Sequence, residues 1–144
     1  MNEFKVLPMY ENKLDILLIE DDIDDVDLLH DALQDNEVAY TMQVIMDGDK
    51  VNNYLTSGAG FPEIIIMDLN MPKTDGKQIL KEIKASSFRN VPLMVLTTSS
   101  AREDIEYCYN MGADKFLTKP ATIEDWNLTI DNILKVAGRT SDQS

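Results

Sequence analysis

Short apolar runs alternate with amphipathic stretches along this chain. Three runs, Leu14–Ile19, Ile64–Met67 and residues 93–96, are almost wholly apolar, which is typical of parallel strands covered by helices on both faces. Residues 41–46 alternate in polarity and Lys115–Thr118 is short, so we expect these two strands at the edges of the sheet. Five strand-and-helix pairs in succession predict an α/β fold with a parallel sheet.

Helical spacing of apolar side chains marks the stretches between these strands. Apolar residues recur every three or four positions in residues 23–33 and again in residues 123–137, so each stretch has one face to bury. A third helix is expected over residues 76–85. These helices would cover both faces of the sheet.

Capping residues predict where several helices begin and end. Ser100 and Glu103 have the spacing of a capping box that would open the fourth helix, and Thr122 is a candidate cap for the fifth. Gly112 and Gly58 are expected in the left-handed conformation that closes the fourth and second helices.

Length, charge and cysteine content limit the possible functions. With 144 residues we expect a single domain over residues 13–137, an N-terminal extension at 1–12 and a C-terminal tail at 138–144, and no second domain. The net charge of -13 disfavours binding to nucleic acid or to anionic membranes. Cys108 is the only cysteine, and no apolar run is long enough to span a bilayer, so a cytoplasmic location is expected.

Polar side chains follow four of the predicted strands. Glu20 and Asp21 come directly after the first strand, Asp68 follows the third, Thr97 the fourth and Lys119 the fifth. Ligands of open parallel sheets bind outside the carboxyl ends of the strands, where the loops converge. We therefore expect these side chains to face one cleft.

Three carboxylates in one cleft repel each other unless a cation lies between them. Oxygen ligands of this kind suit Mg²⁺, so Asp21 and Asp68 are predicted metal ligands, with Glu20 acting through water and the backbone carbonyl of Asn70 completing the site. With the metal in place, the Asp68 carboxylate could attack phosphorus and form an acyl phosphate. Capping of the next helix is the other interpretation of Glu20 and Asp21.

Two further side chains complete this predicted chemistry. Lys119 would pair with Asp68 and then with a phosphoryl oxygen, while the Thr97 hydroxyl would bind another phosphoryl oxygen. Pro120 permits a cis peptide bond that would aim Lys119 into the cleft.

At four places the chain resembles response-regulator receiver domains of two-component systems, in the order and spacing of that family over about residues 13–137. The matching blocks are ILLIEDD at residues 16–22, MDLNMP at 67–72 followed by Asp75 and Gly76, LTT at 96–98 and FLTKP at 116–120. Within the family, the chain is most similar to the small stand-alone regulators that partner bacterial phytochrome kinases.

The resemblance implies a flavodoxin-like (βα)5 three-layer sandwich with strand order 2-1-3-4-5. It also implies transfer of phosphate to Asp68 from a histidine kinase or a histidine phosphotransfer protein, followed by slow hydrolysis. Such a protein is a switch rather than an enzyme, and at most it promotes its own phosphorylation and dephosphorylation. The family couples Thr97 to Phe116 and so changes the surface of the fourth helix, fifth strand and fifth helix, where a downstream protein or a second copy of the chain would bind.

Three other functions compete with this interpretation. A dehalogenase-like phosphatase needs a second aspartate two residues after its nucleophile, where this chain has Asn70. A flavodoxin-type carrier would need a neutral phosphate loop where this chain has Glu20 and Asp21. A pseudo-receiver, which keeps the acidic pocket but binds partners without phosphate transfer, remains the alternative.

Overall fold

The computed structural model of the protein describes residues 12–139, and the predicted end segments at 1–12 and 138–144 lie outside that range except for Asn12, Gly138 and Arg139. No helix in the described range is long and apolar enough to cross a membrane. The elements are β1 (Leu14–Ile19), α2 (Ile23–Asp35), β2 (Tyr40–Ile45), η1 (Gly48–Lys50), α3 (Val51–Leu55), β3 (Ile64–Met67), β4 (Asn70–Met71), β5 (Thr74–Asp75), α4 (Gly76–Lys84), β6 (Leu93–Thr97), α5 (Arg102–Asn110), β7 (Lys115–Thr118) and α6 (Ile123–Val136).

Five of the strands form one sheet in the order β2-β1-β3-β6-β7, and every neighbouring pair is parallel. In chain order this is 2-1-3-4-5, so the predicted flavodoxin-like topology is confirmed, with β2 and β7 at the edges. Ile19 pairs with both Ile45 and Met67, and Thr97 pairs with Thr118. The carboxyl ends of the strands are therefore aligned along one edge of the sheet.

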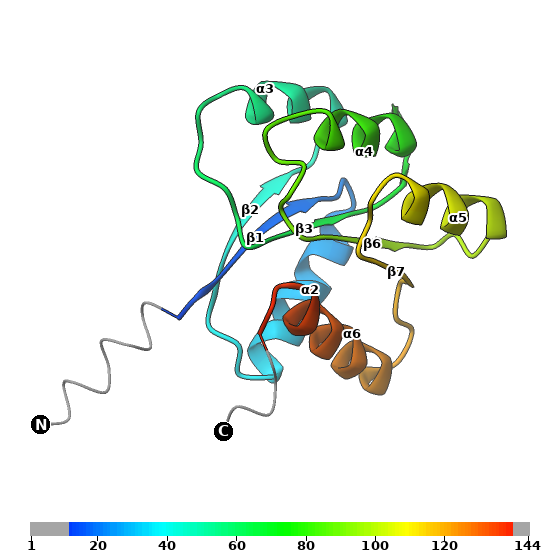
Figure 1. Ribbon diagram of the computed structural model, residues 1–144. Coiled ribbons are helices and arrows are strands. Elements are labelled where there is room, and N and C mark those ends of the chain that lie inside the picture. Colours follow the sequence, from blue (N-terminus) through cyan, green and yellow to red (C-terminus); the bar gives the residue numbers. More distant parts are fainter. Residues whose placement is uncertain (1–11, 140–144) are drawn as a thin grey trace, which may run out of the picture.

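Two apolar clusters cover the two faces of the sheet, as Figure 1 shows with α3, α4 and α5 on one side and α2 and α6 on the other. Alternate residues of β1 enter different clusters: Leu17 and Ile19 pack with the first group of helices, and Ile16 and Leu18 with the second. This explains why β1 is apolar at consecutive positions.

β2 differs slightly from the prediction. It begins at Tyr40 and ends at Ile45, one residue earlier than expected at each end. Pairing with β1 sets this limit, because Ile45 pairs with Ile19, the last residue of β1, and Met46 is 42% exposed. The alternation predicted for this edge strand is present, with Thr41 and Gln43 exposed between partly buried neighbours.

The predicted glycine and threonine caps are confirmed. Gly58 and Gly112 have positive φ angles of 84° and 103° in the turns that follow α3 and α5. The Thr122 side chain accepts a hydrogen bond from the Asp125 amide at 3.0 Å and opens α6.

The prediction of a capping box at Ser100 and Glu103 is wrong. α5 begins at Arg102, and its N-cap residue, Ala101, makes no side-chain capping bond. Ser99 is the polar residue of this turn: its hydroxyl accepts from the Ala101 amide at 3.3 Å and contacts Asp104 Oδ2 at 2.5 Å. Ser99, one position before the predicted Ser100, thus makes the side-chain hydrogen bonds at the start of α5.

Gly76 allows two backbone segments near the carboxyl edge of the sheet to approach closely. A Cβ atom at this position would lie 2.3 Å from the carbonyl oxygen and 2.5 Å from the Cα atom of Leu69. Both contacts are shorter than carbon and oxygen atoms tolerate. The absence of a side chain at Gly76 therefore sets how closely α4 approaches the loop that follows Asp68.

We expect Gly76→Ala to lower the free energy of unfolding by about 2 kcal/mol or more, because the new methyl group must displace backbone rather than a flexible side chain. Urea unfolding measures this loss. Gly60→Ala is the matched control, since a Cβ there meets nothing within 4 Å, and it should change stability by less than about 0.5 kcal/mol. Equal stability of the two variants would contradict the close packing at Gly76.

Candidate functional site

The polar residues predicted from the strand ends lie together at the carboxyl edge of the sheet. Glu20 directly follows β1, Asp68 directly follows β3 and Thr97 ends β6. All three are buried, with 4%, 3% and 0% of their surface exposed. Buried carboxylates are costly unless cations or hydrogen bonds compensate them, so the partners of these groups decide what the site can do.

Glu20, Asp21 and Asp68 form a compact acidic group. One carboxylate oxygen from each residue lies within 4.8 Å of the others. Several hard oxygen ligands at this spacing fit a divalent cation of the Mg²⁺ or Mn²⁺ type. Asn70 lies beside the group: its backbone amide donates to Asp68 Oδ1 at 3.0 Å, and its side-chain amide donates to Thr98 Oγ1 at 3.2 Å.

Lys119 provides a positive charge inside this acidic edge. Its ammonium nitrogen lies 2.8 Å from Asp68 Oδ2 and 2.9 Å from Glu20 Oε1, and its side chain is 14% exposed. A third carboxylate, Asp25 in the first turn of α2, is the nearest of the three at 2.6 Å. Sequence reasoning assigned no role to Asp25, although its place in the helix that follows β1 put it near this edge.

The backbone also holds Lys119 in place. Its amide donates to the Thr97 carbonyl at 2.8 Å, which continues the pairing of β7 with β6 for one more residue. The cis bond that Pro120 permits does not occur, because residues 12–139 contain no cis peptide. Strand pairing and three ion pairs direct this side chain toward Glu20, Asp25 and Asp68 without a cis bond.

The pKa values of these groups follow from burial and from their neighbours. Burial raises the pKa of Glu20 to about 7, and the nearby Asp68 charge adds to the rise, although Lys119 opposes it. Burial would also raise the pKa of Asp68, but the Asn70 amide and Lys119 lower it below its ordinary value. Burial alone would lower the pKa of Lys119, and its carboxylate partners raise it instead. At neutral pH Asp68 is therefore an anion beside a cation.

Thr97 has an unusual hydroxyl group. The residue is fully buried, and its Oγ1 atom makes no hydrogen bond of regular geometry with the described residues, although it lies near enough to Asp68 to help lower the pKa of that carboxyl group. Buried hydroxyl groups are nearly always paired, and one without a partner lowers stability. A polar ligand arriving at the carboxyl edge of the sheet could take up this bond.

Phe116, the predicted aromatic partner of Thr97, lies in the core. It is 8% exposed on β7 and belongs to the apolar cluster that includes Cys108 and Ala113. Its backbone amide donates to the hydroxyl of Tyr109 at 3.0 Å, which ties β7 to α5. The ring is thus already packed inward in this structure.

Comparison with known proteins agrees with this geometry. The family model described as the response regulator receiver domain matches residues 16–131. The chain is 31% identical to the probable methanogenesis regulatory protein FilR2 of Methanothrix harundinacea, over 85% of this chain and 83% of that protein. It is also 31% identical to response regulator Rcp1 of Synechocystis, over 76% of this chain and 79% of that protein.

Solved structures give the same result. The phosphorylated cyanobacterial phytochrome response regulator RcpA matches with a TM-score of 0.75 and 30% identity, over 85% of this chain and 92% of that one. The Mn²⁺-bound form of Rcp1 matches with a TM-score of 0.73 and 29% identity, over 84% and 91%. On its sequence blocks, sheet order and acidic edge, this chain belongs to the response regulator receiver domain family.

Proposed function

We propose that this protein is a phosphorylation-dependent signalling switch in which Asp68 accepts a phosphoryl group from a histidine kinase or a histidine phosphotransfer protein. One observation carries the proposal: Asp68 is an anion whose carboxylate lies within 4.8 Å of those of Glu20 and Asp21 and 2.8 Å from the Lys119 ammonium nitrogen. On this account the protein is not an enzyme with a separate substrate, and at most it promotes its own phosphorylation and dephosphorylation.

We assign Mg²⁺ to the acidic group, with Asp21 and Asp68 as direct ligands, Glu20 acting through water and the Asn70 carbonyl completing the set. The donor atoms support a hard divalent cation. Rcp1, a structural neighbour, has been solved in an Mn²⁺-bound form, which supports a divalent cation here as well. When bound, such an ion offsets the negative charge that gathers where the phosphoryl group is transferred.

The chain's own residues account for the rest of the proposed reaction. A carboxylate oxygen of Asp68 forms a bond to phosphorus while the bond from phosphorus to the donor histidine nitrogen breaks, and that nitrogen leaves with the electron pair. Lys119 then bonds a phosphoryl oxygen in place of the Asp68 carboxylate. The Thr97 hydroxyl donates to another phosphoryl oxygen and so gains the partner that it lacks.

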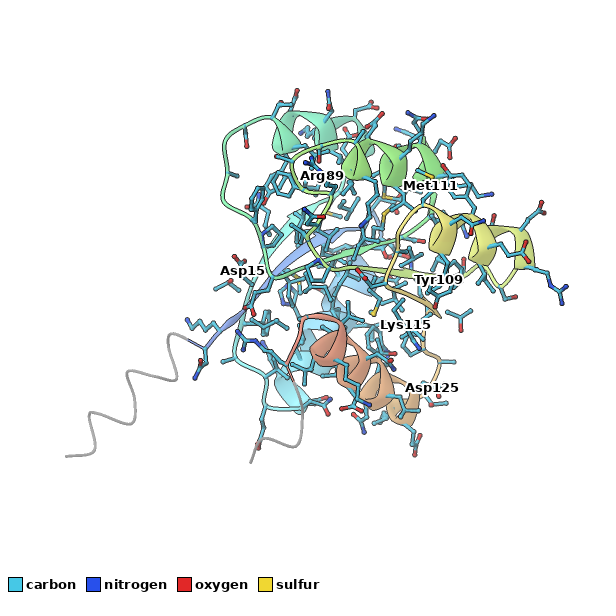
Figure 2. All side chains as sticks on the ribbon, viewed as in Figure 1. Asp15, Arg89, Tyr109, Met111, Lys115 and Asp125 are labelled. Atoms are coloured by element: carbon cyan, nitrogen blue, oxygen red, sulfur yellow. The ribbon has the colours of Figure 1, made fainter. Side chains whose placement is uncertain are left out.

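The proposed output surface is formed by α5, β7 and α6, where a downstream protein or a second copy of the chain would bind. Thr97 on β6 and Phe116 on β7 lie in neighbouring strands, so a shift at the phosphoryl site reaches this surface through direct packing. Figure 2 shows Tyr109, Lys115 and Asp125 along this side of the molecule. Tyr109 and Leu128 expose 44% and 62% of their surface there.

The remaining assignments follow from charge. A net charge of -13 repels phosphate backbones and anionic lipids, so we assign protein partners in the cytoplasm rather than nucleic acid or membranes.

Incubation with acetyl phosphate and Mg²⁺ should add one phosphoryl group to the parent protein, and Asp68→Asn should abolish the addition because the amide is not a nucleophile toward phosphorus. Intact-mass spectrometry at neutral pH measures this. Asp49→Asn, an exposed aspartate of η1, is the control and should load normally. An unchanged mass of the parent protein would favour the pseudo-receiver, which binds partners without phosphate transfer.

Thr97→Val should slow phosphoryl loading without destabilising the fold. Removal of a buried hydroxyl that has no partner should leave the free energy of unfolding unchanged or raise it by about 1 kcal/mol. Loading by acetyl phosphate should nevertheless slow by about tenfold or more, because one donor to the phosphoryl group is lost.

Urea unfolding and the time course of intact mass measure the two effects of Thr97→Val. Thr118→Val, at the exposed residue that pairs with Thr97 on β7, is the control and should change neither. A destabilised Thr97→Val protein with a normal loading rate would show that the hydroxyl serves the fold instead.

A further inference from the structure

The Lys119 ammonium group has as many carboxylate partners as it has N–H bonds. An ammonium group donates three hydrogen bonds. Carboxylate oxygens of Asp25, Asp68 and Glu20 lie at 2.6, 2.8 and 2.9 Å from its nitrogen. Each comes from a different part of the chain, so the three together set the direction in which the ammonium group points.

Asp25 differs from the other two partners. Glu20 and Asp68 belong to the acidic group that fits a divalent cation, together with Asp21, whereas Asp25 does not. A cation bound to that group would share the charge of Glu20 and Asp68 and weaken their attraction for Lys119. Asp25 would then be the partner whose charge remains fully available to the ammonium group.

The fold holds Asp25 firmly. It lies in the first turn of α2, which the Asp22 side chain caps by accepting from the Asp24 amide at 2.9 Å. Val26 and Leu29 anchor the same part of the helix, with 4% and 1% of their surface exposed. A carboxylate on such a fixed element can orient a flexible lysine.

We infer that Asp25 is a positioning residue for Lys119. It holds the ammonium group with one N–H directed toward the Asp68 carboxylate when the divalent cation binds, and toward a phosphoryl oxygen once the phosphoryl group is on Asp68. The part of this inference that concerns the phosphoryl group rests on the function proposed above, whereas the part that concerns the cation does not depend on phosphate transfer.

Loss of Asp25 should therefore weaken cation binding. Without this partner Lys119 would be held only by Glu20 and Asp68, which are two of the three residues that the cation needs. The ammonium group and the cation would then compete for the same carboxylates.

Trp126 offers a direct signal for cation binding. It is the only tryptophan of the chain, and it lines a small cavity together with Asp25, Lys119 and Glu20. Titration with Mg²⁺ should therefore change its fluorescence. We expect Asp25→Asn to raise the Kd for Mg²⁺ by about fivefold, in line with the loss of one partly exposed ion pair.

Two variants separate positioning from simple loss of charge. Asp24→Asn removes the same charge from the neighbouring, exposed position of α2, where the side chain does not contact Lys119, and it should change the Kd by less than about twofold. Asp25→Glu keeps the carboxylate and should restore the Kd to within about twofold of the parent value. Circular dichroism checks that each variant is folded.

Phosphoryl loading gives the second measurement. At saturating Mg²⁺, so that weaker cation binding no longer matters, Asp25→Asn should load from acetyl phosphate about five to ten times more slowly than the parent protein. Asp24→Asn and Asp25→Glu should load at nearly the parent rate. If Asp25 only stabilised the fold, Asp25→Asn that is still folded would load as fast as the other two variants.

The outcomes are distinguishable. If Asp25→Asn matches Asp24→Asn in both Kd and loading rate, or binds Mg²⁺ more tightly than the parent, the positioning role is wrong while the proposed function stands. If the parent binds Mg²⁺ but never gains phosphate, the proposed function fails and the titrations alone decide the role of Asp25. If the parent does not bind Mg²⁺, both ideas are overturned.

Discussion

Repulsion between carboxylates at the carboxyl edge of the sheet is the constraint on which the site depends. Glu20 and Asp68 are buried there beside Asp21, and buried anions at this spacing raise each other's energy unless cations lie between them. Lys119 supplies one positive charge, and together with the Asn70 amide it lowers the pKa of Asp68 in spite of burial. Burial raises the pKa of Glu20 to about 7, and the nearby Asp68 charge adds to this rise against the opposing effect of Lys119. An edge where carboxylates outnumber the Lys119 ammonium group is suited to take up a divalent cation.

The fold holds the side chains of this site in defined positions. Parallel strands that are buried on both faces end at matched positions, so residues distant in the sequence meet at one edge. The close approach of Gly76 to Leu69 fixes the loop that follows Asp68. Among the buried side-chain nitrogen and oxygen atoms of residues 12–139, the Thr97 hydroxyl oxygen is the one without a hydrogen bond of regular geometry. Groups that lower stability in this way are typical of sites that complete their bonding only with a ligand.

Much of the fold and most of the acidic edge could be predicted from the sequence, because both depend on local patterns. Consecutive apolar residues identified β1, β3 and β6, and the residues just after the strands identified Glu20, Asp68 and Lys119. Asp25 was missed because its contact with Lys119 spans 94 positions and depends on how α2 packs beside the end of β7. The predicted capping box at Ser100 was wrong because α5 begins one residue later than expected, and sequence patterns locate the start of a helix only to within about one or two residues.

We propose that the acidic edge binds a divalent cation beside a reactive aspartate. The most direct test is to titrate the parent protein with Mg²⁺ and to follow its backbone amide signals by NMR spectroscopy. We expect a saturable response of one ion per chain, with the largest shifts at Glu20, Asp21, Asp68 and Asn70. Unchanged amide signals at these residues, at Mg²⁺ concentrations of several millimolar, would contradict it.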